Sequence, residues 1–544
     1  MLGMMMDTQL MISSLLKFAD RNFPEREIVS VTYDNPRHRY TYKEAFQRTR
    51  QLANALESLG AKFGDRVGTM AWNDYRHLEL YYAIAGSGMV CHTINPKLAP
   101  KQVTYIVNHA EDRLIFVDPM LLPLVEAIDE HLPKVEHYII MTDRAHMPET
   151  SLKNVLCYDD LIADQSDEFE WPEFDERTAS GLCYTSGTTG NPKGVMYSHR
   201  STLLHAYAGA LPSVSGLKST DVVLPVVPMF HVNAWGLPYN GIMSGTKIVM
   251  PGPKMGDGET LQALIEEEQV TITSGVPTIW MALLDYLEQS GKNISSVQTV
   301  SVGGAACPAS IIERFRDDHN VLVKQGWGMT ETSPLGTVFS LKNGMEDLDK
   351  HEVAKIQAKQ GSGVFGIEMK ITDEDNNELP WDGVAFGTLK VKGPWVASGY
   401  FKQEEGQSPL DDKGWFDTGD VAMIDPQGYL MITDRTKDVI KSGGEWISSI
   451  EIENAAANHE GVAEAAVIGC YHPRWTERPL LIVIKQPGST VDKDEMLEFL
   501  GGKLDKVSIP NDVVFVDEIP HTATGKISKL DLRKQFKDYT FPGV

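Results

Sequence analysis

The sequence predicts an α/β fold in two parts, and three features of the chain carry that prediction. Short apolar runs alternate with segments of helical periodicity along most of the chain, which is typical of βαβ units around mainly parallel sheet. From Gly361 the segments are short, alternating and rich in turn residues, which favours a small antiparallel barrel or sheet. After Asp434 the α/β pattern returns. We therefore expect a large N-terminal domain, 1–434, and a smaller C-terminal domain, 435–544.

The individual elements follow from these patterns in chain order. Four apolar runs, RLIFVD, HYIIMTD, VTITSGVP and VQTVSVGGA, are the expected strands of the large domain. Between the last two runs, Ile279, Leu283 and Leu287 recur at helical spacing and predict a helix. GVFGIEMKITDEDNNELP and GTLKVKGPWVASGYF predict the antiparallel part. The segments from Ile450 to Cys470 and PLLIVIK predict α/β structure in the C-terminal domain.

Composition and charge exclude several classes of protein. The chain of 544 residues has 50 basic and 75 acidic side chains, a net charge of −25, which argues against nucleic acid as a partner. Hydrophobic residues make up 42% and charged residues 23%, which excludes a disordered or fibrous chain. The five cysteines are scattered, without a C-x-x-C pair, so we expect neither disulfides nor a zinc site. With no secretory signal and no apolar stretch of about 18 residues, we expect a cytoplasmic protein without a membrane span.

The densest group of candidate ligand atoms lies in YTSGTTGNPKG, from Tyr184 to Gly194. Its glycines allow successive backbone N–H groups to point at one anion, and Lys193 adds a positive charge. The segment is not a Walker A loop, because it contains no Gly-Lys-Ser/Thr sequence. A surface hairpin rich in turn residues is the alternative interpretation. We favour a phosphate-binding loop.

TSGTTGNPKG resembles the phosphate loop of the adenylate-forming superfamily, which comprises acyl-CoA synthetases, beetle luciferases and the adenylation domains of peptide synthetases. Further segments resemble the family's other motifs in the same order: PMFHVNAWG, VGGAACP, QGWGMTETSP, WFDTGDVAMIDPQGYLMITDRTKDVIKSGGEWIS and HTATGKISKLDLRK. Together these motifs extend from Tyr184 to Arg533. The N-terminal segments resemble the bacterial fatty-acyl-CoA ligases, in the branch that includes 3-methylmercaptopropionyl-CoA ligases of dimethylsulfoniopropionate breakdown.

The resemblance implies a fold and a two-step reaction. The large domain would be built from doubly wound sheets plus a small β-barrel, and the C-terminal domain would be mobile. A carboxylate would attack the α-phosphate of ATP to give acyl-AMP and pyrophosphate, and the CoA thiol would then displace AMP. Two approaching anions need a metal ion and fixed cations, and Mg²⁺ prefers hard oxygen ligands. The implied magnesium ligands are Thr185 and Glu331.

The resemblance also assigns the catalytic groups, namely Thr330, Glu331, His231 and Lys526. Lys526 would place a compact positive charge between the α-phosphate and the carboxylate. The acid is already ionised at neutral pH, so His231 would orient it rather than remove a proton. Judged on isolated residues, Glu331 could instead be a solvated helix-cap acid and His231 a core histidine. The implied walls of the acyl pocket are His231, Val232, Trp235 and Gly304.

Nucleotide and CoA contacts are likewise carried over from the motifs. Asp420 would accept hydrogen bonds from both ribose hydroxyls, and a structural ion pair with Arg435 is the alternative. Trp327 would offer a flat face to adenine, although a tryptophan is more often part of a core. Lys437 would be the hinge of the rotating C-terminal domain. The implied contact positions are Thr185, Ser186, Gly187, Thr188, Thr189, Lys193, His231, Gly303, Gly304, Ala305, Gly326, Trp327, Gly328, Met329, Thr330, Asp420, Arg435, Lys437, Lys441, Gly443, Gly444, Glu445, Trp446 and Lys526.

The expected function is therefore an AMP-forming carboxylate–CoA ligase for 3-methylmercaptopropionate and/or short- to medium-chain fatty acids. The expected partners are a small carboxylic acid, ATP, CoA and a possible second copy of the chain. A medium- or long-chain ligase without methylmercaptopropionate specificity and a carrier-protein-loading adenylation enzyme stay open. A luciferase-like oxygenase, a kinase and a non-catalytic ATP sensor also stay open. The products of the reaction would distinguish these possibilities.

Overall fold

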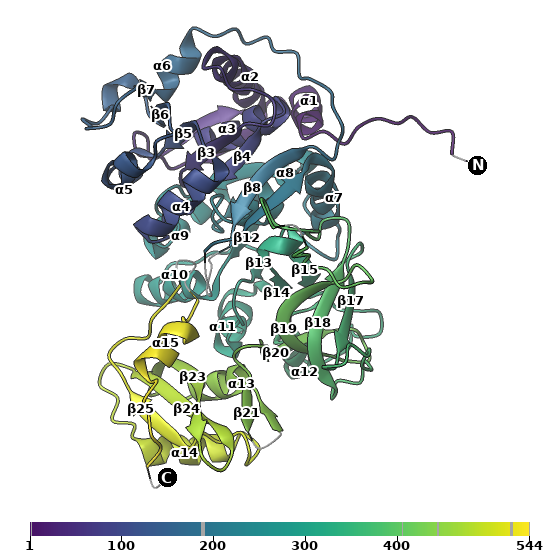
Figure 1. Cartoon of the computed structure of the whole chain (residues 1–544), viewed down its shortest axis with the longest axis vertical. Helices are drawn as coiled ribbons and strands as arrows, with labels where there is room; N and C mark the ends of the chain where they lie inside the picture. Colours follow the sequence, from purple (N-terminus) through teal and green to yellow (C-terminus); the bar gives the residue numbers. More distant parts are fainter. Residues whose placement is uncertain (2, 186–190, 405, 443–444, 523–525, 543–544) are drawn as a thin grey trace.

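The computed structural model describes residues 1, 3–185, 191–404, 406–442, 445–522 and 526–542, and the side chains of Glu445 and Trp446 are not described. Figure 1 shows two sheets of the N-terminal part, an antiparallel sheet beside them and the C-terminal domain at the opposite end of the molecule. This mixed α/β arrangement, with a large N-terminal domain and a smaller C-terminal one, confirms the predicted fold class.

The first sheet has seven strands in the order β7-β6-β5-β3-β4-β8-β9, and its last pair is antiparallel while the others run parallel. The predicted strands near Leu114 and His137 are its β5 and β6. Its strands are β3 (Arg66–Met70), β4 (Val90–Thr93), β5 (Leu114–Val117), β6 (His137–Ile140), β7 (Val155–Cys157), β8 (Ala179–Tyr184) and β9 (Gly194–Ser198). The helices that accompany it are α2 (Tyr42–Ser58), α3 (Tyr75–Gly86), α4 (Pro100–Ala110), α5 (Leu122–Ile128) and α6 (Tyr158–Ala163).

The second sheet has nine strands in the order β16-β15-β14-β13-β12-β10-β11-β1-β2, with a parallel centre and antiparallel edges. Its strands are β1 (Glu27–Ser30), β2 (His38–Thr41), β10 (Val222–Pro225), β11 (Lys247–Met250), β12 (Ile272–Gly275), β13 (Thr299–Val302), β14 (Leu322–Gly328), β15 (Leu335–Val338) and β16 (Ser362–Gly363). Its helices are α1 (Ser13–Asn22), α7 (His199–Ala210), α8 (Leu237–Ser244), α9 (Gly258–Glu268), α10 (Pro277–Ser290), α11 (Ala309–His319) and α12 (Lys350–Gln357).

Helix α10 is the helix that the leucine spacing predicts. Proline in its first turn needs no intrahelical N–H bond, and Gly291 ends it in the left-handed conformation at φ 67°. Leu283 and Leu287 are buried in the core beneath β12 and β13. Helix α3 is buried along its whole length, because it contacts β3, β4 and β8 of the first sheet and β1 of the second. The large domain is therefore two sheets packed on shared helices.

The third sheet is antiparallel and consists of β17 (Glu368–Thr372), β18 (Phe386–Lys392), β19 (Phe416–Ile424) and β20 (Leu430–Arg435). The predicted small β-barrel corresponds to this four-stranded sheet, which has β17 and β20 at its two ends. Strand β20 is also bonded on its outer side, because the Leu430 N–H donates to the Gly361 carbonyl (2.7 Å). Asp420 of β19 and Arg435 of β20 are cross-strand partners in this sheet. Strand β20 contains the predicted domain boundary after Asp434, which stays a prediction.

The C-terminal domain has a sheet of five strands, with β25 beside β24, covered by helices (Figure 1). Its strands are β21 (Ile440–Ser442), β22 (Glu445–Ile447), β23 (Val462–His472), β24 (Thr476–Lys485) and β25 (Asp512–Phe515), and its helices are α13 (Ser449–Ala457), α14 (Lys493–Gly501) and α15 (Lys529–Gln535). Across the described ranges, no helix has the length and apolar character needed to cross a bilayer. All five cysteines are buried and free.

Candidate active site

The predicted phosphate loop joins the antiparallel pair β8 and β9, so it is a hairpin connection. Tyr184 of β8 pairs with Gly194 of β9. At the base of the loop the Thr185 N–H donates to the Lys193 carbonyl (2.9 Å), and the Lys193 N–H donates to the Thr185 hydroxyl (3.1 Å). These bonds hold the two ends of the loop together. Ser186, Gly187, Thr188 and Thr189, which complete the predicted loop, lie outside the described residues.

Tyr400 connects the phosphate hairpin to Glu331 and is a site residue that sequence reasoning missed. Its hydroxyl donates to Glu331 Oε1 (2.8 Å), and Lys193 Nζ lies 4.7 Å from the centre of its ring. Burial and the charge of Glu331 raise the pKa of the Tyr400 hydroxyl, so it remains a donor. The backbone around it is anchored too, because the Phe401 N–H donates to the Gly194 carbonyl (2.8 Å). Nothing in the sequence PWVASGYF indicated that its tyrosine would lie next to Glu331.

Glu331 and Thr330 lie in a short 3₁₀ turn, Thr330–Thr332, that follows β14. Both residues are buried, each with 7% of its surface exposed, so Glu331 is not a solvated cap acid. The Tyr197 hydroxyl donates to the Thr330 carbonyl (2.8 Å) and fixes the turn. Neither the Thr330 hydroxyl nor Glu331 Oε2 has a hydrogen-bond partner among the described residues. The turn therefore offers a hydroxyl and a carboxylate oxygen for a ligand.

Asp420, the predicted ribose contact, is held by two other predicted site residues. Its Oδ1 pairs with Arg435 Nε (2.7 Å), and its Oδ2 accepts from Trp327 Nε1 (2.8 Å). Burial raises the pKa of this carboxyl, whereas the charges of Arg435 and Lys526 and the Trp327 bond oppose the increase. The ion pair that was an alternative interpretation is thus present. Each carboxylate oxygen keeps a second lone pair for a ligand.

The glycines beside Trp327 allow two neighbouring strands to come close to each other. A Cβ at Gly328 would lie 1.6 Å from the Pro334 carbonyl oxygen, and one at Gly326 would lie 2.7 Å from the Thr337 carbonyl oxygen. Both glycines therefore allow β15 to approach β14. One face of the Trp327 ring packs on Gly336, where a Cβ would lie 2.5 Å from the ring. Met329, which follows, is half-buried against the antiparallel sheet.

The segment after His231 forms an unusual left-handed turn. Val232, Asn233, Ala234 and Trp235 all have φ between 47° and 56°, and Gly236 follows at 79°. Left-handed conformations cost about 1–2 kcal/mol per non-glycine residue, and such strain is found preferentially at functional sites. The turn presents the Trp235 ring to Gly303, where a Cβ would lie 3.0 Å from Cη2. The strained backbone thus lies in the segment that was predicted to form part of the wall of the acyl pocket.

The glycine turn after β13 lies next to the left-handed turn that carries Trp235. Gly304 has φ 80° and is exposed, as is Ala305, whereas Gly303 is buried under Trp235. A Cβ at Gly303 would also lie 3.4 Å from the Gly326 carbonyl oxygen, so this turn is a neighbour of β14. The structure therefore brings together the His231, Gly303 and Trp327 motifs.

Lys526 of the C-terminal domain faces this group of residues. The residue as a whole is exposed, but the protein around its ammonium group desolvates it and lowers its pKa to about 8. The charge of Arg435 also lowers this pKa, whereas Asp420 and Glu331 raise it. Desolvation, with the charge of Lys526, lowers the pKa of His231 to about 4. His231 is therefore neutral at pH 7 and cannot act as a fixed cation.

One further predicted contact, Lys441, lies elsewhere in this structure. Lys441 pairs with Glu374 (3.4 Å), in the connection between β17 and β18, and thus faces the antiparallel sheet rather than the phosphate hairpin. Lys437 lies in the turn after β20, where the Asp438 N–H donates to the Arg435 carbonyl (2.8 Å). Glu445 and Trp446 belong to β22. Gly443 and Gly444 are outside the described residues.

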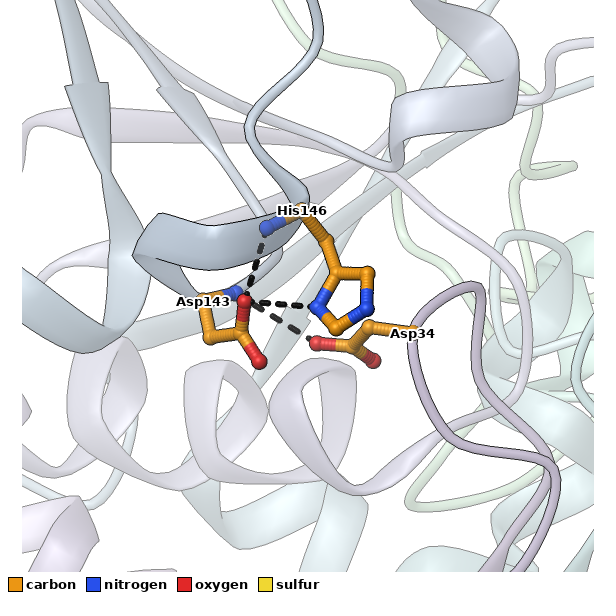
Figure 2. Close-up of side chains that lie close together, drawn as sticks. All are labelled: Asp34, Asp143 and His146. Atoms are coloured by element: carbon orange, nitrogen blue, oxygen red, sulfur yellow. Dashed lines mark hydrogen bonds and ion pairs between the residues drawn. The ribbon is translucent and has the colours of Figure 1, made fainter.

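A second cluster of metal-type side chains, which sequence reasoning did not single out, consists of Asp34, Asp143 and His146 (Figure 2). His146 Nδ1 lies 2.8 Å from Asp143 Oδ1. Arg76 binds Asp34 through both of its terminal nitrogens (2.7 and 3.1 Å), which holds the pKa of Asp34 well below its usual range. Because a guanidinium already neutralises the buried carboxylate, we interpret this cluster as structural.

Comparisons with known proteins find relatives along most of the chain. The family model described as AMP-binding enzyme matches residues 16–401, and that of the AMP-binding enzyme C-terminal domain matches residues 451–526. The chain is 50% identical to 3-methylmercaptopropionyl-CoA ligase of Ruegeria lacuscaerulensis, over 99% of both chains. It is 46% identical to medium-chain-fatty-acid–CoA ligase of Ectopseudomonas oleovorans, over 99% of this chain and 98% of the relative.

A solved structure shows the same architecture. The crystal structure of the anthranilate CoA ligase AuaEII in complex with anthranoyl-AMP matches with a TM-score of 0.85 and 26% identity, over 96% of this chain and 97% of the other. The family models and these relatives together match nearly the whole chain. The chain therefore belongs to the AMP-binding enzyme family, among the acid–thiol ligases of that family.

Proposed function

We propose that the protein activates 3-methylmercaptopropionate and/or short- to medium-chain fatty acids with ATP and transfers them to CoA. The acid attacks the α-phosphate to form acyl-AMP and release pyrophosphate, and the CoA thiol then displaces AMP. One observation carries this proposal: Lys526, from the C-terminal domain, lies within electrostatic range of His231, Glu331, Asp420 and Arg435 of the N-terminal domain. A lysine in that place serves a reaction between two anions.

The described groups divide the work of adenylation. The Lys526 ammonium group neutralises charge that develops between carboxylate and α-phosphate. The free Thr330 hydroxyl donates to a phosphate oxygen. His231 is neutral because its pKa is about 4, so it orients the carboxylate by hydrogen bonding. No general base is required for this step, since carboxylic acids are ionised at pH 7.

The carboxylate of Glu331 fits a magnesium ion. It is buried, it has no ion-pair partner among the described residues, and its Oε2 is available while Tyr400 fixes Oε1. Together with the Thr185 hydroxyl it provides the hard oxygen donors that Mg²⁺ prefers, with the remaining positions left to phosphate and water. When bound, Mg²⁺ would supply charge neutralisation to the phosphates. Glu331 and Thr185 are therefore the proposed metal ligands.

The nucleotide itself fits the Asp420 side of the cleft. Asp420 is held in place by Trp327 and Arg435, and its remaining lone pairs can accept from both ribose hydroxyls. The adenine would lie between the exposed Gly304–Ala305 turn and β14, with Gly303, Gly326, Trp327, Gly328 and Met329 around it. Lys193 and the loop between β8 and β9 would hold the outer phosphates.

The second half-reaction is assigned to a rotated C-terminal domain. We place the boundary between residues 434 and 435 and the pivot at Lys437. In the described conformation Lys526 faces the cleft and Lys441 is held by Glu374, which is the arrangement expected for adenylation. Rotation would exchange Lys526 for the segment that contains Lys441, Gly443, Gly444, Glu445 and Trp446, which would then contact CoA.

Two observations support a short acid. The first is the 50% identity to a 3-methylmercaptopropionyl-CoA ligase over nearly the whole chain. The second is the position of the Trp235 ring against Gly303, where it would limit the proposed acyl pocket together with Val232 and Gly304. A medium- or long-chain ligase and a carrier-protein-loading enzyme are the alternatives, and the 46% identity to a medium-chain ligase favours the former. The proposal includes a cytoplasmic location and a homodimer.

A panel of acids tests the function. The purified chain is incubated with ATP, Mg²⁺, CoA and one acid each from 3-methylmercaptopropionate, pentanoate, octanoate, palmitate, benzoate and an amino acid. AMP, pyrophosphate and thioester are measured together. The proposal expects equal amounts of the three products and the highest kcat/KM with the short acids. ADP as the product, or a tenfold preference for palmitate or benzoate, would contradict it.

A further inference from the structure

Asp434 of strand β20 connects the antiparallel sheet to the C-terminal domain. The residue is 1% exposed and pairs with Val421 in the sheet, so its backbone lies on the N-terminal side of the proposed pivot. Its side chain contacts helix α13, which packs against β20 (Figure 1). The Ser449 N–H donates to Asp434 Oδ2 (2.7 Å), and the Ser449 hydroxyl donates to the same oxygen (2.6 Å). One carboxylate oxygen thus joins the two parts of the molecule.

The C-terminal domain receives this carboxylate in a group of side chains that we call the Asp434 socket, namely Ser449, Glu453 and Lys529. Lys529 Nζ donates to the Ser449 hydroxyl and pairs with Glu453 Oε1 (2.9 Å). Although burial opposes it, the charges of Glu453 and Asp434 raise the pKa of Lys529, so its ammonium group is protonated at pH 7. Ser449 also begins helix α13, whose N-terminus favours a negative charge. The Asp434 socket therefore suits a carboxylate.

The contacts of the Asp434 socket differ in whether they cross the proposed pivot. Ser449, Glu453 and Lys529 all follow Lys437 in the chain and lie in helices of the C-terminal domain. Their contacts with one another therefore do not depend on the orientation of that domain. Of the contacts described above, those to Asp434 cross the pivot, and a rotation of the domain about Lys437 would break them. The two bonds to Asp434 thus exist in one orientation and are lost in the other.

The Asp434 socket is also close to the proposed catalytic lysine. Lys529 is the first residue of α15 and follows Lys526 by three positions. Between them, the Ser528 N–H donates to the Pro520 carbonyl (2.7 Å), which holds this segment against the chain that precedes it. Because the segment is held in this way, the contact of Lys529 with Ser449 limits where Lys526 can lie.

Resting on the proposed function, we propose that Asp434 is a positioning residue for adenylation. Its bonds to the Asp434 socket hold the C-terminal domain in the orientation in which Lys526 faces the cleft. A hydrogen bond to a charged group shifts an equilibrium between two orientations by about tenfold or more. Loss of the Asp434 carboxylate should therefore lower the fraction of the enzyme that is ready for adenylation and raise the fraction that is ready for thioester formation.

The test measures the two half-reactions separately in the wild type and in Asp434→Ala, Asp434→Asn, Ser449→Ala and Asp512→Asn. Pyrophosphate release reports adenylation, and thioester formation from added acyl-AMP and CoA reports the second step. Asp512→Asn is the matched control, because Asp512 is a buried carboxylate held by Lys493 (2.5 Å) and Tyr539 within the C-terminal domain. Its substitution should lower the melting temperature without changing the ratio of the two rates.

Asp434→Ala should slow adenylation by about three- to tenfold and leave thioester formation from acyl-AMP unchanged or faster. Asp434→Asn keeps an acceptor for the Ser449 N–H, so it should change the ratio of the two rates less. Ser449→Ala, which removes the hydroxyl donor, should change the ratio in the same direction as Asp434→Ala.

Equal slowing of both steps, or an unchanged ratio, in Asp434→Ala would overturn the inference while the proposed function stands, because AMP and thioester are still formed. If that variant does not fold, an unchanged ratio in Ser449→Ala has the same meaning. A change of the ratio in Asp512→Asn as large as that in Asp434→Ala would also overturn the inference, because any loss of stability in the domain would then suffice. A wild type that forms neither AMP nor thioester from any acid contradicts the proposed function itself.

Discussion

Replacing Lys526 by alanine should separate the two half-reactions. Its ammonium group faces Glu331, Asp420 and His231 in the described conformation. Removing one preorganised electrostatic contact lowers rates by about 10²–10³-fold. Adenylation should slow by that factor. Thioester formation from added acyl-AMP and CoA should remain near the wild-type rate, because the rotated domain carries Lys526 away from the cleft.

The lowered pKa of Lys526 gives this prediction a pH signature. A lysine is charged below its pKa and neutral above it, and desolvation brings that pKa from 10.5 to about 8. The free enzyme should therefore lose kcat/KM for ATP as pH rises through about 8, by about tenfold per unit well above it. In the complex with ATP, the bound phosphates add negative charge and raise the pKa of Lys526. We therefore expect kcat to fall at a higher pH than kcat/KM. Lys526→Arg should lack the decrease near pH 8, since guanidinium stays protonated.

The assay follows pyrophosphate release for the first step and thioester formation from synthetic acyl-AMP for the second, from pH 6.5 to 10. Lys529→Ala is not a suitable control, because Lys529 pairs with buried Glu453. Lys534→Ala is suitable, since its side chain is exposed and, among the residues that the structure describes, pairs only with Asp531. If Lys526→Ala slowed both steps equally, Lys526 would be a structural cation, and the proposed rotation of the C-terminal domain would lose its support.

Three further predictions address other residues of the site. Glu331→Ala removes the proposed magnesium ligand and should abolish AMP formation without changing the melting temperature by more than a few degrees; near wild-type turnover at saturating Mg²⁺ would refute the assignment. Tyr400→Phe removes the donor to Glu331 Oε1 and should raise the Mg²⁺ concentration for half-maximal adenylation by about tenfold, as measured by magnesium titration, whereas KM for the acid should not change. Lys437→Pro fixes φ at the proposed pivot and should slow thioester formation more than adenylation in the same two assays; an equal effect on both would argue against this pivot.

Most of the secondary structure could be predicted because it depends on neighbours in the sequence. The apolar run around Ile272 and the leucine spacing of Leu283 and Leu287 predict β12 and α10, and both are present. Periodicity does not specify how the edge of a sheet is covered, and the outer side of β20 bonds to the segment just before β16 through Leu430 and Gly361. Which edges meet in space is decided by packing.

The site shows the same division between local and distant information. Motif order placed Glu331, Asp420 and Lys526 in one list of candidates, yet Tyr400 was missed, because the residue it fixes is 69 positions away in the chain. The pairing of Asp420 with Arg435 follows from the register of β19 and β20, which spacing does not reveal.

The sequence by itself determined the family motifs, the alternation of strands and helices, and the types of side chain available for binding phosphate and metal. The tertiary structure decided which of those side chains meet and how they are charged. His231 is neutral and Lys526 has a pKa of about 8 because other segments exclude water from them. Desolvation and Coulomb interactions depend on distances between atoms from distant parts of the chain, and folding alone sets those distances.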